Sequence, residues 1–522
     1  MEQKRWLFLI PLGGILSALC LIFPKIGFLQ WATMAPMLFW LFCRVKREDA
    51  PRLRRLYGVG FLYFMSFYLV IYHWFFYLYP MEFAGITPAA AAGLVLICWI
   101  GLSVLQSSLF ALIFPLFGLL LRTRLLRRVP ILTPFLFAVQ YTVAEWSQTL
   151  TWMGVPWARL PLGQMEMGFF ANSASLLGSY FLTFCLVCVN TLIAYAVAHT
   201  DRVRFCAFAA AATVSLSTVL GLVGYVSTDP HEGERIVVAA VQGNIGSSQK
   251  WSAESNRKTM EVYERYTAEA AANGADLVVF PETFLPYSFE TVKAYVTRLA
   301  TTYDVTVMCG TFHNEGLEEY NGLYTVYPDG TVDETVYCKR KLVPFGEFVP
   351  WRPVIELLIP PLANMSMLSS DLSPGEDSAI VEAPFAAVGG LICFDSIYET
   401  LALDSVRDGA TLFVLPTNDS WFTDSAAVYM HSAQARLRAI ENGRWIVRSA
   451  DTGISSIIDP RGESHEEQPP LLEGMALGEA YVQSGRTLYS RIGNLFLYVL
   501  IALLLALPTS ELVLLLRARR KR

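Results

Sequence analysis

Eight long apolar runs constrain the fold of this chain more than any other feature of its sequence. Most of them reach the ~20 residues that a helix needs to cross a bilayer. They lie at residues 6–23, 27–43, 57–79, 89–121, 129–145, 169–198, 205–227 and 493–516. Because apolar runs continue after the first one, that run is more than a cleaved signal peptide. The pattern predicts a membrane domain of about seven helices at residues 1–227, a soluble domain at 228–486, and a membrane helix with a basic tail at 487–522.

The positive charges lie in short clusters beside these apolar runs. Charged residues make up only 16% of the chain, against about 25% in soluble proteins. With a cytoplasmic N-terminus, nineteen Lys and Arg residues fall in cytoplasmic segments and only Lys25 and Arg159 in short connections on the other side. This bias predicts cytoplasmic N- and C-termini and an extracytoplasmic soluble domain. It is the pattern of membrane topology and argues against a nucleic-acid partner.

The soluble domain has the pattern of alternating strands and helices. Apolar, β-branched runs at 236–241, 276–280 and 305–309 are typical of buried strands. The segments 253–273 and 426–443 carry apolar residues at helical spacing. Buried strands covered by helices predict an α/β domain.

Three strands of this domain end in residue types that form a coherent chemical set: Glu282, Lys339 and Cys393. Taken singly, each has an ordinary structural explanation: Glu282 as a helix cap, Lys339 as a surface charge and Cys393 as a core residue. Functional groups in α/β folds gather where strands end and loops begin. A carboxylate base, an ammonium that stabilises an oxyanion and a sulfur nucleophile together suffice for acyl transfer, with no metal or organic cofactor.

The histidines and the other cysteines of the domain fit this set less well. Only His313 closely follows an apolar strand, which weakens a Cys–His pair. Cys309, Cys338 and Cys393 are odd in number, so at least one thiol is free or pairs between chains. Whether Cys309 and Cys338 form a disulfide stays open at this point.

Several segments occur in the order of a known superfamily. The segments “VVFPETF”, “CKRKLVPFGEFVP”, “LICFDSIYE” and “LPTNDSWF” resemble the carbon–nitrogen hydrolase (nitrilase) superfamily, whose catalytic set is Glu-Lys-Cys. With the flanking apolar runs, “GVPWARLPLGQ” and “VQGNIGSSQKW”, nearly the whole chain resembles the apolipoprotein N-acyltransferase family. The resemblance implies a polytopic α-helical membrane domain plus an extracytoplasmic α/β nitrilase-like domain, built as a four-layer αββα sandwich.

The resemblance also implies roles for single positions. Glu282 matches the general base, Lys339 the group that stabilises the oxyanion, and Cys393 the nucleophile. Glu347 matches a further acidic residue that orients Lys339, and Trp251 an aromatic residue near the mouth of the pocket.

The chain departs from the family pattern directly after the cysteine. Tyr-Glu is common there, whereas this sequence has Phe394 and Asp395. The change removes a hydroxyl and shortens the acid by one methylene, which puts in doubt any hydrogen bond credited to these positions. Asn418 and Asp419 have both a pocket-lining and a structural interpretation.

The implied reaction is N-acylation of the N-terminal S-diacylglyceryl-cysteine of an apolipoprotein, the last step of lipoprotein maturation. A phospholipid, typically phosphatidylethanolamine, donates an acyl chain to Cys393, and the α-amine of the diacylglyceryl-apolipoprotein then attacks the thioester in a ping-pong reaction. The implied location is the plasma (inner) membrane of a bacterium. Two alternatives stay open: a membrane-anchored amidase or nitrilase with water as the acceptor, and a transporter or scaffold with a non-catalytic outer domain.

Three other segments carry narrower expectations. The apolar loop at 355–368 either lies against the bilayer and admits acyl chains or packs on its own domain. The aromatic cluster “YHWFFYLY” at 72–79 is typical of a belt at the membrane interface. In the segment 426–443, Arg436, Arg438 and Glu441 are expected to form a structural ion pair and to have no catalytic role.

Overall fold

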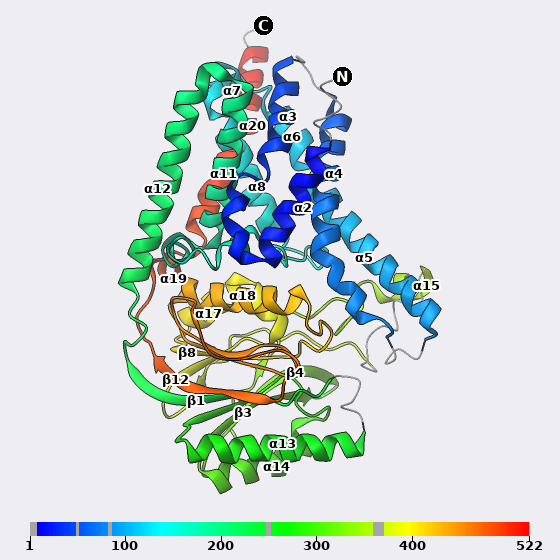
Figure 1. Cartoon of the computed structure of the whole chain (residues 1–522), viewed down its shortest axis with the longest axis vertical. Helices are drawn as coiled ribbons and strands as arrows, with labels where there is room; N and C mark the ends of the chain where they lie inside the picture. The colour runs from blue at the N-terminus through cyan, green and yellow to red at the C-terminus, as the bar shows by residue number, and fades with distance from the viewer. Residues whose placement is uncertain (1–7, 48–51, 82–85, 247–251, 359–369, 521–522) are drawn as a thin grey trace. The chain divides into compact units, whose positions relative to one another are not determined.

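The computed structural model describes residues 8–47, 52–81, 86–246, 252–358 and 370–520 (Figure 1). The chain forms two compact units. The helical unit comprises the segment up to His73, Leu96–Ser227 and the segment from Ile492 onward, and the sheet-containing unit comprises Trp74–Val95 and Thr228–Arg491.

The helical unit has helices that are long and apolar enough to cross a membrane. These segments are Pro24–Arg44, Leu53–Leu78, Pro88–Leu120, Ser179–Ala198 and Thr200–Ser227, with shorter apolar helices at Leu9–Ile22 and Leu495–Ser510. Within the described residues, the helices of this unit and its connections are α2 (Leu9–Ile22), α3 (Ala35–Arg47), α4 (Leu53–Ile71), α5 (Pro88–Ala111), α6 (Ile113–Leu120), α7 (Arg124–Arg128), α8 (Thr133–Ser147), α9 (Phe169–Asn172), α10 (Ala174–Leu177), α11 (Ser179–Ala198), α12 (Val203–Ser227) and α20 (Leu495–Arg520).

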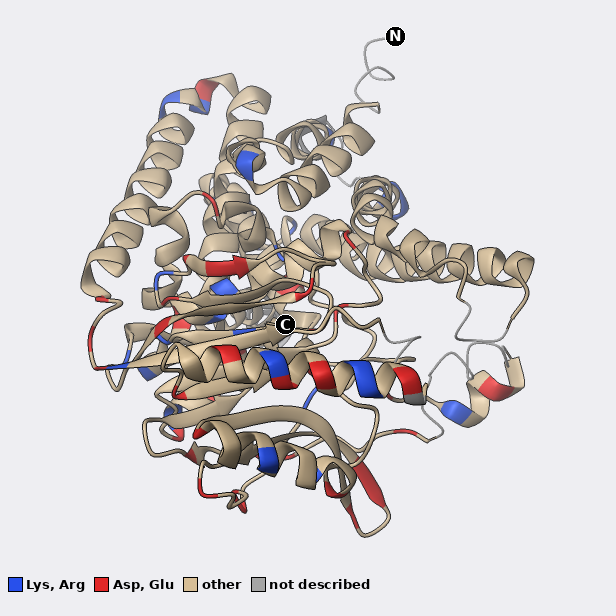
Figure 2. Ribbon diagram, turned by 60° about the horizontal axis from the view of Figure 1, so that its bottom comes forward, with Lys and Arg blue, Asp and Glu red and all other residues tan. Residues whose placement is uncertain are grey.

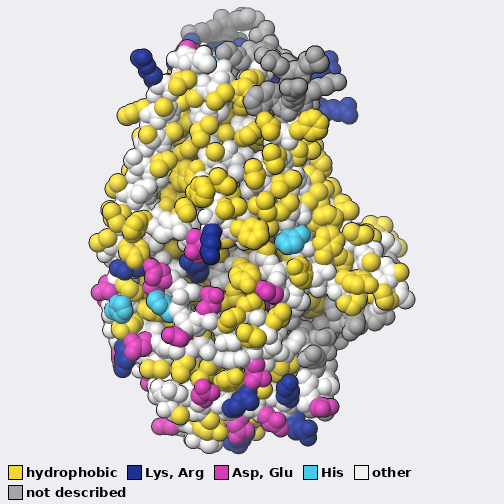
Figure 3. Space-filling view, in the orientation of Figure 1, with side chains coloured by type: hydrophobic (Ala, Val, Ile, Leu, Met, Phe, Trp, Pro, Cys, Tyr) yellow, Lys and Arg dark blue, Asp and Glu magenta, His cyan; other side chains and the backbone are white. Residues whose placement is uncertain are grey.

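The surface of the helical unit is apolar, as a lipid-facing surface must be. On α12, the side chains of Phe208, Leu216 and Val226 are all more than half exposed. Figure 3 shows hydrophobic side chains over most of the visible face of these helices, and Figure 2 shows few charged residues on them. Exposed apolar area of this extent is typical of a surface that contacts lipid.

The helix breaks within two of the predicted apolar runs. In the run 89–121, α5 ends at Ala111 and α6 begins at Ile113, because Pro115 has no N–H to donate to the carbonyl of Ala111. In the run 169–198, Gly178 has a φ of +77° and separates α10 from α11.

The sheet-containing unit has two six-stranded sheets, of order β12-β1-β2-β3-β4-β5 and β11-β10-β9-β8-β7-β6. The strands β1, β2 and β3 run parallel, as do β7, β8 and β9, and the remaining pairs are antiparallel. The strands are β1 (Glu234–Gln242), β2 (Leu277–Phe280), β3 (Thr306–Glu315), β4 (Glu318–Val326), β5 (Tyr337–Cys338), β6 (Val381–Glu382), β7 (Ala387–Gly390), β8 (Leu412–Thr417), β9 (Ile446–Ala450), β10 (Ser455–Ile458), β11 (Ser464–Gln468) and β12 (Gly474–Val482).

The two sheets pack face to face and helices cover their outer faces, which confirms the predicted αββα sandwich. Alternation along β2 shows the layering: Leu277 and Val279 enter the core between the sheets, while Val278 and Phe280 enter the core beneath the helices. Figure 1 shows α13 and α14 on one side and α17 and α18 on the other. These helices are α13 (Ala253–Ala272), α14 (Phe289–Tyr303), α17 (Glu399–Arg407) and α18 (Ala426–Asn442).

The aromatic cluster at 72–79 differs from a simple interfacial belt. It forms the 3-10 helix η2 (Tyr72–Leu78), and from Trp74 onward it belongs to the sheet-containing unit. The rings of Trp74 and Phe422 pack edge to face, with centroids 4.9 Å apart. Phe422 lies in the loop after β8, so part of the cluster packs on that loop.

Candidate active site

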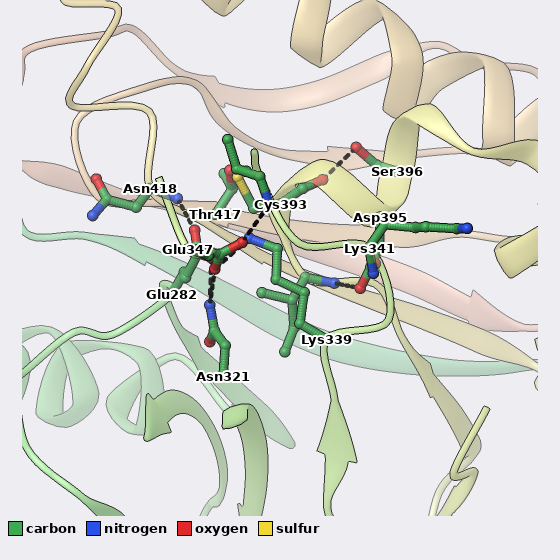
Figure 4. Close-up of polar contacts among 12 residues, drawn as sticks. Glu282, Asn321, Lys339, Lys341, Glu347, Cys393, Asp395, Ser396, Thr417 and Asn418 are labelled. Carbon is green, nitrogen blue, oxygen red and sulfur yellow. Dashed lines mark hydrogen bonds and ion pairs between the residues drawn. The ribbon is translucent and has the colours of Figure 1, made fainter. Parts of the chain in front are cut away.

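The three residues predicted from strand ends lie together (Figure 4). Glu282 follows β2, Lys339 follows β5 and Cys393 follows β7. The Nζ of Lys339 donates to Oε1 of Glu282 at 2.8 Å, and the charges of both residues act on the thiol of Cys393. A carboxylate, an ammonium and a thiol therefore share one buried site.

The carboxylate of Glu282 is fixed by several donors. Its Oε1 also accepts from Nδ2 of Asn321 at 2.6 Å, and its Oε2 accepts from the backbone N–H of Asn418 at 2.8 Å. A Cβ at Gly310 on β3 would lie 2.7 Å from Cα of Glu282, so the neighbouring strand needs glycine for this close approach. Asn418 thus contacts the site through its backbone.

Lys339 bridges two carboxylates. Its Nζ lies 2.8 Å from Oε1 of Glu282 and 2.9 Å from Oε1 of Glu347. The other oxygen of Glu347 accepts from the backbone N–H of Val343 at 2.8 Å, which fixes that side chain. Burial disfavours the charged form of Lys339, but Glu282 and Glu347 outweigh it and raise the pKa of Lys339 well above its ordinary value. Lys339 is therefore a cation in a buried site.

Cys393 begins the 3-10 helix η7 (Cys393–Ile397) and has a φ of +48°. Few non-glycine residues adopt this conformation, and those that do cluster at functional sites. Burial, with the charges of Glu282 and Asp419, raises the pKa of the Cys393 thiol, while Lys339 and a hydrogen bond to Thr417 oppose the shift. The resting thiol is neutral, so its reaction as a nucleophile needs a base.

The two positions that depart from the family pattern are both accommodated. Asp395 Oδ2 accepts from the Tyr337 hydroxyl at 2.8 Å, and its Oδ1 accepts from the backbone N–H of Lys341 at 2.8 Å. The shorter acid thus connects η7 to the segment that carries Lys339. The ring of Phe394 packs against Tyr398 with centroids 5.6 Å apart.

Asp395 gives a pH-dependent prediction. Burial raises the pKa of Asp395 to about 6, although Lys339 and hydrogen bonds from Tyr337, Lys341 and Ile392 lower it. The folded protein holds this proton more tightly than the unfolded chain, whose aspartates have a pKa of about 3.9, so ionisation removes stability as the pH rises from about 4 to about 6. Relative to Asp395→Asn, the wild type should lose about 1 kcal/mol of unfolding free energy between pH 5 and pH 7. Unfolding of both proteins in one detergent measures the difference between their unfolding free energies. A difference that stays constant between pH 5 and pH 7 contradicts the prediction.

Several residues around the site were not predicted. Asn321 lies within β4, and Thr417 ends β8, where its hydroxyl reaches Oδ1 of Asp419 at 3.2 Å. His431 of α18 lies beside Cys393, with Nε2 3.1 Å from the backbone oxygen of Cys393. The pattern of histidines that follow an apolar strand, which indicated only His313, missed His431 because that residue lies on a helix. Trp251 lies outside the described residues.

Two groups of the described residues have metal-ligand chemistry: Cys393 with Asp419 and His431, and Asp459 with Glu463 and His465. In the first group, Asp419 already pairs with His431 at 2.8 Å and with Arg448 at 2.7 Å. Its carboxylate is thus engaged within the protein, which favours a hydrogen-bonded cluster over a metal site.

Other expectations concern structural residues. A structural ion pair was predicted among Arg436, Arg438 and Glu441, and the structure forms it between Arg438 and Glu441, fully buried at 2.9 Å. Cys309 and Cys338 are both free thiols.

The comparisons with known proteins agree with this architecture. The carbon–nitrogen hydrolase family model matches residues 237–481, and the model of the apolipoprotein N-acyltransferase N-terminal domain matches residues 13–192. A carbon–nitrogen hydrolase from Helicobacter pylori matches with a TM-score of 0.38 and 18% identity, covering 48% of this chain and 91% of that one. The match to the family model identifies residues 237–481, which hold the two sheets, as a carbon–nitrogen hydrolase domain.

Relatives that match nearly the whole chain identify the family. Apolipoprotein N-acyltransferase of Geobacter metallireducens is 30% identical over 512 residues, covering 96% of this chain and 94% of its own. The enzyme of the same name from Gloeobacter violaceus is 30% identical over 511 residues, covering 94% and 91%. The chain belongs to the apolipoprotein N-acyltransferase family. It is an acyltransferase and, with its membrane-length helices, a bacterial membrane protein.

Proposed function

We propose that Cys393 carries the acyl group during transfer from a phospholipid to a lipoprotein. In the first step, Glu282 takes the thiol proton and the sulfur attacks an ester carbonyl of the phospholipid. Lys339 stabilises the oxyanion that forms. The C–O bond then breaks, the lysophospholipid oxygen takes the proton from Glu282, and a thioester remains on Cys393.

The second step transfers the acyl group to nitrogen. The neutral α-amine of the N-terminal diacylglyceryl-cysteine attacks the thioester carbonyl, and Glu282 takes a proton from that nitrogen. The C–S bond breaks, an amide forms, and the proton returns to the sulfur of Cys393. Conversion of a thioester to an amide is downhill, so this step needs positioning more than driving force.

One observation carries this proposal: the ammonium of Lys339 bridges Glu282 and Glu347 beside a neutral, half-buried thiol. A base is needed because the thiol is neutral, and a cation is needed where a carbonyl oxygen becomes charged. Membership of the family favours an amine over water as the acceptor. We also propose that phosphatidylethanolamine is the donor and that its sn-1 chain is the one transferred.

Intact mass spectrometry tests the reaction. After incubation with a phospholipid of known chains, we expect one fatty-acyl mass on the protein, located at Cys393 by peptide mapping. Hydroxylamine and a diacylglyceryl lipopeptide with a free amine should each remove it, the second giving an N-acylated peptide. Release as free fatty acid in the presence of the lipopeptide would instead support a hydrolase.

We also propose the membrane arrangement that the charge bias predicts. The domain at 228–486 then lies outside the cytoplasm, between a membrane domain at 1–227 and a membrane helix at 487–522. Both substrates are lipids, so this placement brings the site to the leaflet that holds them.

The loop that begins at α15 (Arg352–Leu358) gives a second prediction. Val354, Leu357 and Leu358 are exposed, Leu357 at 81%, and the predicted loop continues into residues outside the described part of the chain. We expect fluorophores on Val354→Cys, Leu357→Cys and Leu358→Cys to be quenched by brominated lipids, because exposed apolar side chains of this kind insert into a bilayer. The control is a fluorophore on Glu261→Cys of α13, which should be quenched only by a water-soluble quencher. Equal quenching by brominated lipids at the three loop positions and at the control would exclude contact of the loop with the membrane.

A further inference from the structure

A second polar cluster adjoins Cys393, and the mechanism above does not use it. It joins His431 of α18, Asp419 of the loop after β8 and Arg448 of β9, all of them buried. The sulfur of Cys393, a carboxylate oxygen of Asp419 and a ring nitrogen of His431 lie within 4.8 Å of one another. Buried polar groups persist only where their hydrogen bonds are satisfied, so the contacts fix where the protons lie.

Asp419 determines the state of one ring nitrogen. Its Oδ1 lies 2.8 Å from Nδ1 of His431, and its Oδ2 accepts from Nη2 of Arg448 at 2.7 Å. Burial alone would raise the pKa of Asp419, but Arg448 and His431 hold that pKa well below its ordinary value. An ionised carboxylate only accepts hydrogen bonds, so Nδ1 carries a hydrogen. Nη2 of Arg448 also lies 3.3 Å from Nδ1, a longer contact than its bond to Asp419.

The other ring nitrogen faces two oxygens. Nε2 of His431 lies 3.1 Å from the backbone oxygen of Cys393 and 3.1 Å from Oγ of Ser396. Ser396 donates its own hydroxyl hydrogen to the carbonyl of Cys393 at 2.8 Å, so its oxygen is an acceptor toward His431. A carbonyl oxygen can only accept. Nε2 therefore also carries a hydrogen, and a ring with two N–H groups is an imidazolium cation.

We propose that His431 is a charged positioning residue: an imidazolium, held by Asp419, that donates to the carbonyl of the nucleophile Cys393. This bond acts on a backbone that needs support, since Cys393 has a φ of +48°. The cation also lies close enough to the sulfur to favour the thiolate that forms during acylation. His431 does not take the thiol proton, because both of its nitrogens are occupied. That proton goes to Glu282 under the proposed function, on which this inference rests.

Nuclear magnetic resonance of the full chain in detergent tests the charge directly. The chain has only six histidines, and 15N-labelled histidine distinguishes a doubly protonated ring from a neutral one. At pH 8, where an ordinary histidine is almost entirely neutral, we expect His431 to show two protonated nitrogens. Assignment uses the resonance lost in His431→Gln, or elimination by replacing the other histidines should that variant fold poorly. A neutral ring at His431 overturns the proposal.

Alkylation of Cys393 by iodoacetamide tests the effect on the thiol without any acyl donor. His431→Gln retains an N–H donor but no charge, and we expect alkylation at pH 8 to be about tenfold slower, equivalent to one pKa unit of the thiol. The matched control is His465→Gln, which removes another His–Asp pair of the domain, 3.2 Å apart, and should leave the rate unchanged. An unchanged rate in His431→Gln overturns the proposal. Neither of these measurements uses phospholipid. If the wild-type protein forms no thioester with phospholipid, that result contradicts the proposed function and leaves the inference about His431 to the two measurements above.

Discussion

Replacing Cys393 by alanine should abolish the acyl-enzyme, with no fatty-acyl mass on the protein after incubation with phospholipid. No other described group at the site combines a nucleophilic atom with an adjacent base and cation, since Glu282 and Lys339 are engaged with each other at 2.8 Å. Loss of a nucleophile that acts as a unit with its base typically costs about 10⁶-fold in rate. Mass spectrometry and a lipopeptide N-acylation assay measure the loss.

Two further variants locate the acyl group. Cys393→Ser should form an ester far more slowly, because the hydroxyl is a weaker nucleophile, and this ester should resist neutral hydroxylamine. Cys338→Ala removes the thiol next to Lys339 and should retain the acyl mass. Acylation of the Cys393→Ala protein at Cys338 or Cys309 would contradict the assignment.

Much of the fold could be predicted because its signals are local. Apolar runs of membrane length and short β-branched strands record burial within each element, so both units could be expected from the sequence. The exact helices could not. Gly178 and Pro115 interrupt the helices within two predicted runs, although Pro88–Leu120 is still one segment of membrane length, because hydropathy averaged over a long run hides a single residue that changes the backbone.

The site was predicted only where a strand end marked it. Glu282, Lys339 and Cys393 each follow an apolar strand, and the sheet topology brings such ends together. Asn321 and His431 carry no such mark. Asn321 lies inside a strand and His431 on a helix. The partners that give Asn321 its role, Glu282 and Glu347, lie 39 and 26 positions away, and neither periodicity nor spacing indicates those contacts. His431 shares α18 with other buried polar residues, including Gln434 and Arg438, so nothing in the sequence singled it out.

Removing the charge of Lys339 should have the second largest effect. In Lys339→Met, Oε1 of Glu282 and Oε1 of Glu347 lose the ammonium that lies 2.8 and 2.9 Å from them. Breaking a buried pair in this way costs about 3–5 kcal/mol of unfolding free energy. The two carboxylates then favour sharing a proton, so Glu282 is a poorer base and the oxyanion has no cation. Acylation should fall by about 10⁴-fold or more.

A double variant separates stability from catalysis. In Lys339→Met with Glu347→Gln, the unpaired charge beside Glu282 is removed, so the unfolding free energy should recover by about 1–3 kcal/mol while acylation stays as low as in Lys339→Met. Glu347→Gln alone leaves the Lys339–Glu282 pair intact and should reduce acylation only by about tenfold, since Glu347 orients Lys339 and does not meet the carbonyl. If the double variant regained activity together with stability, the ammonium would serve the fold alone, and the oxyanion would need another donor.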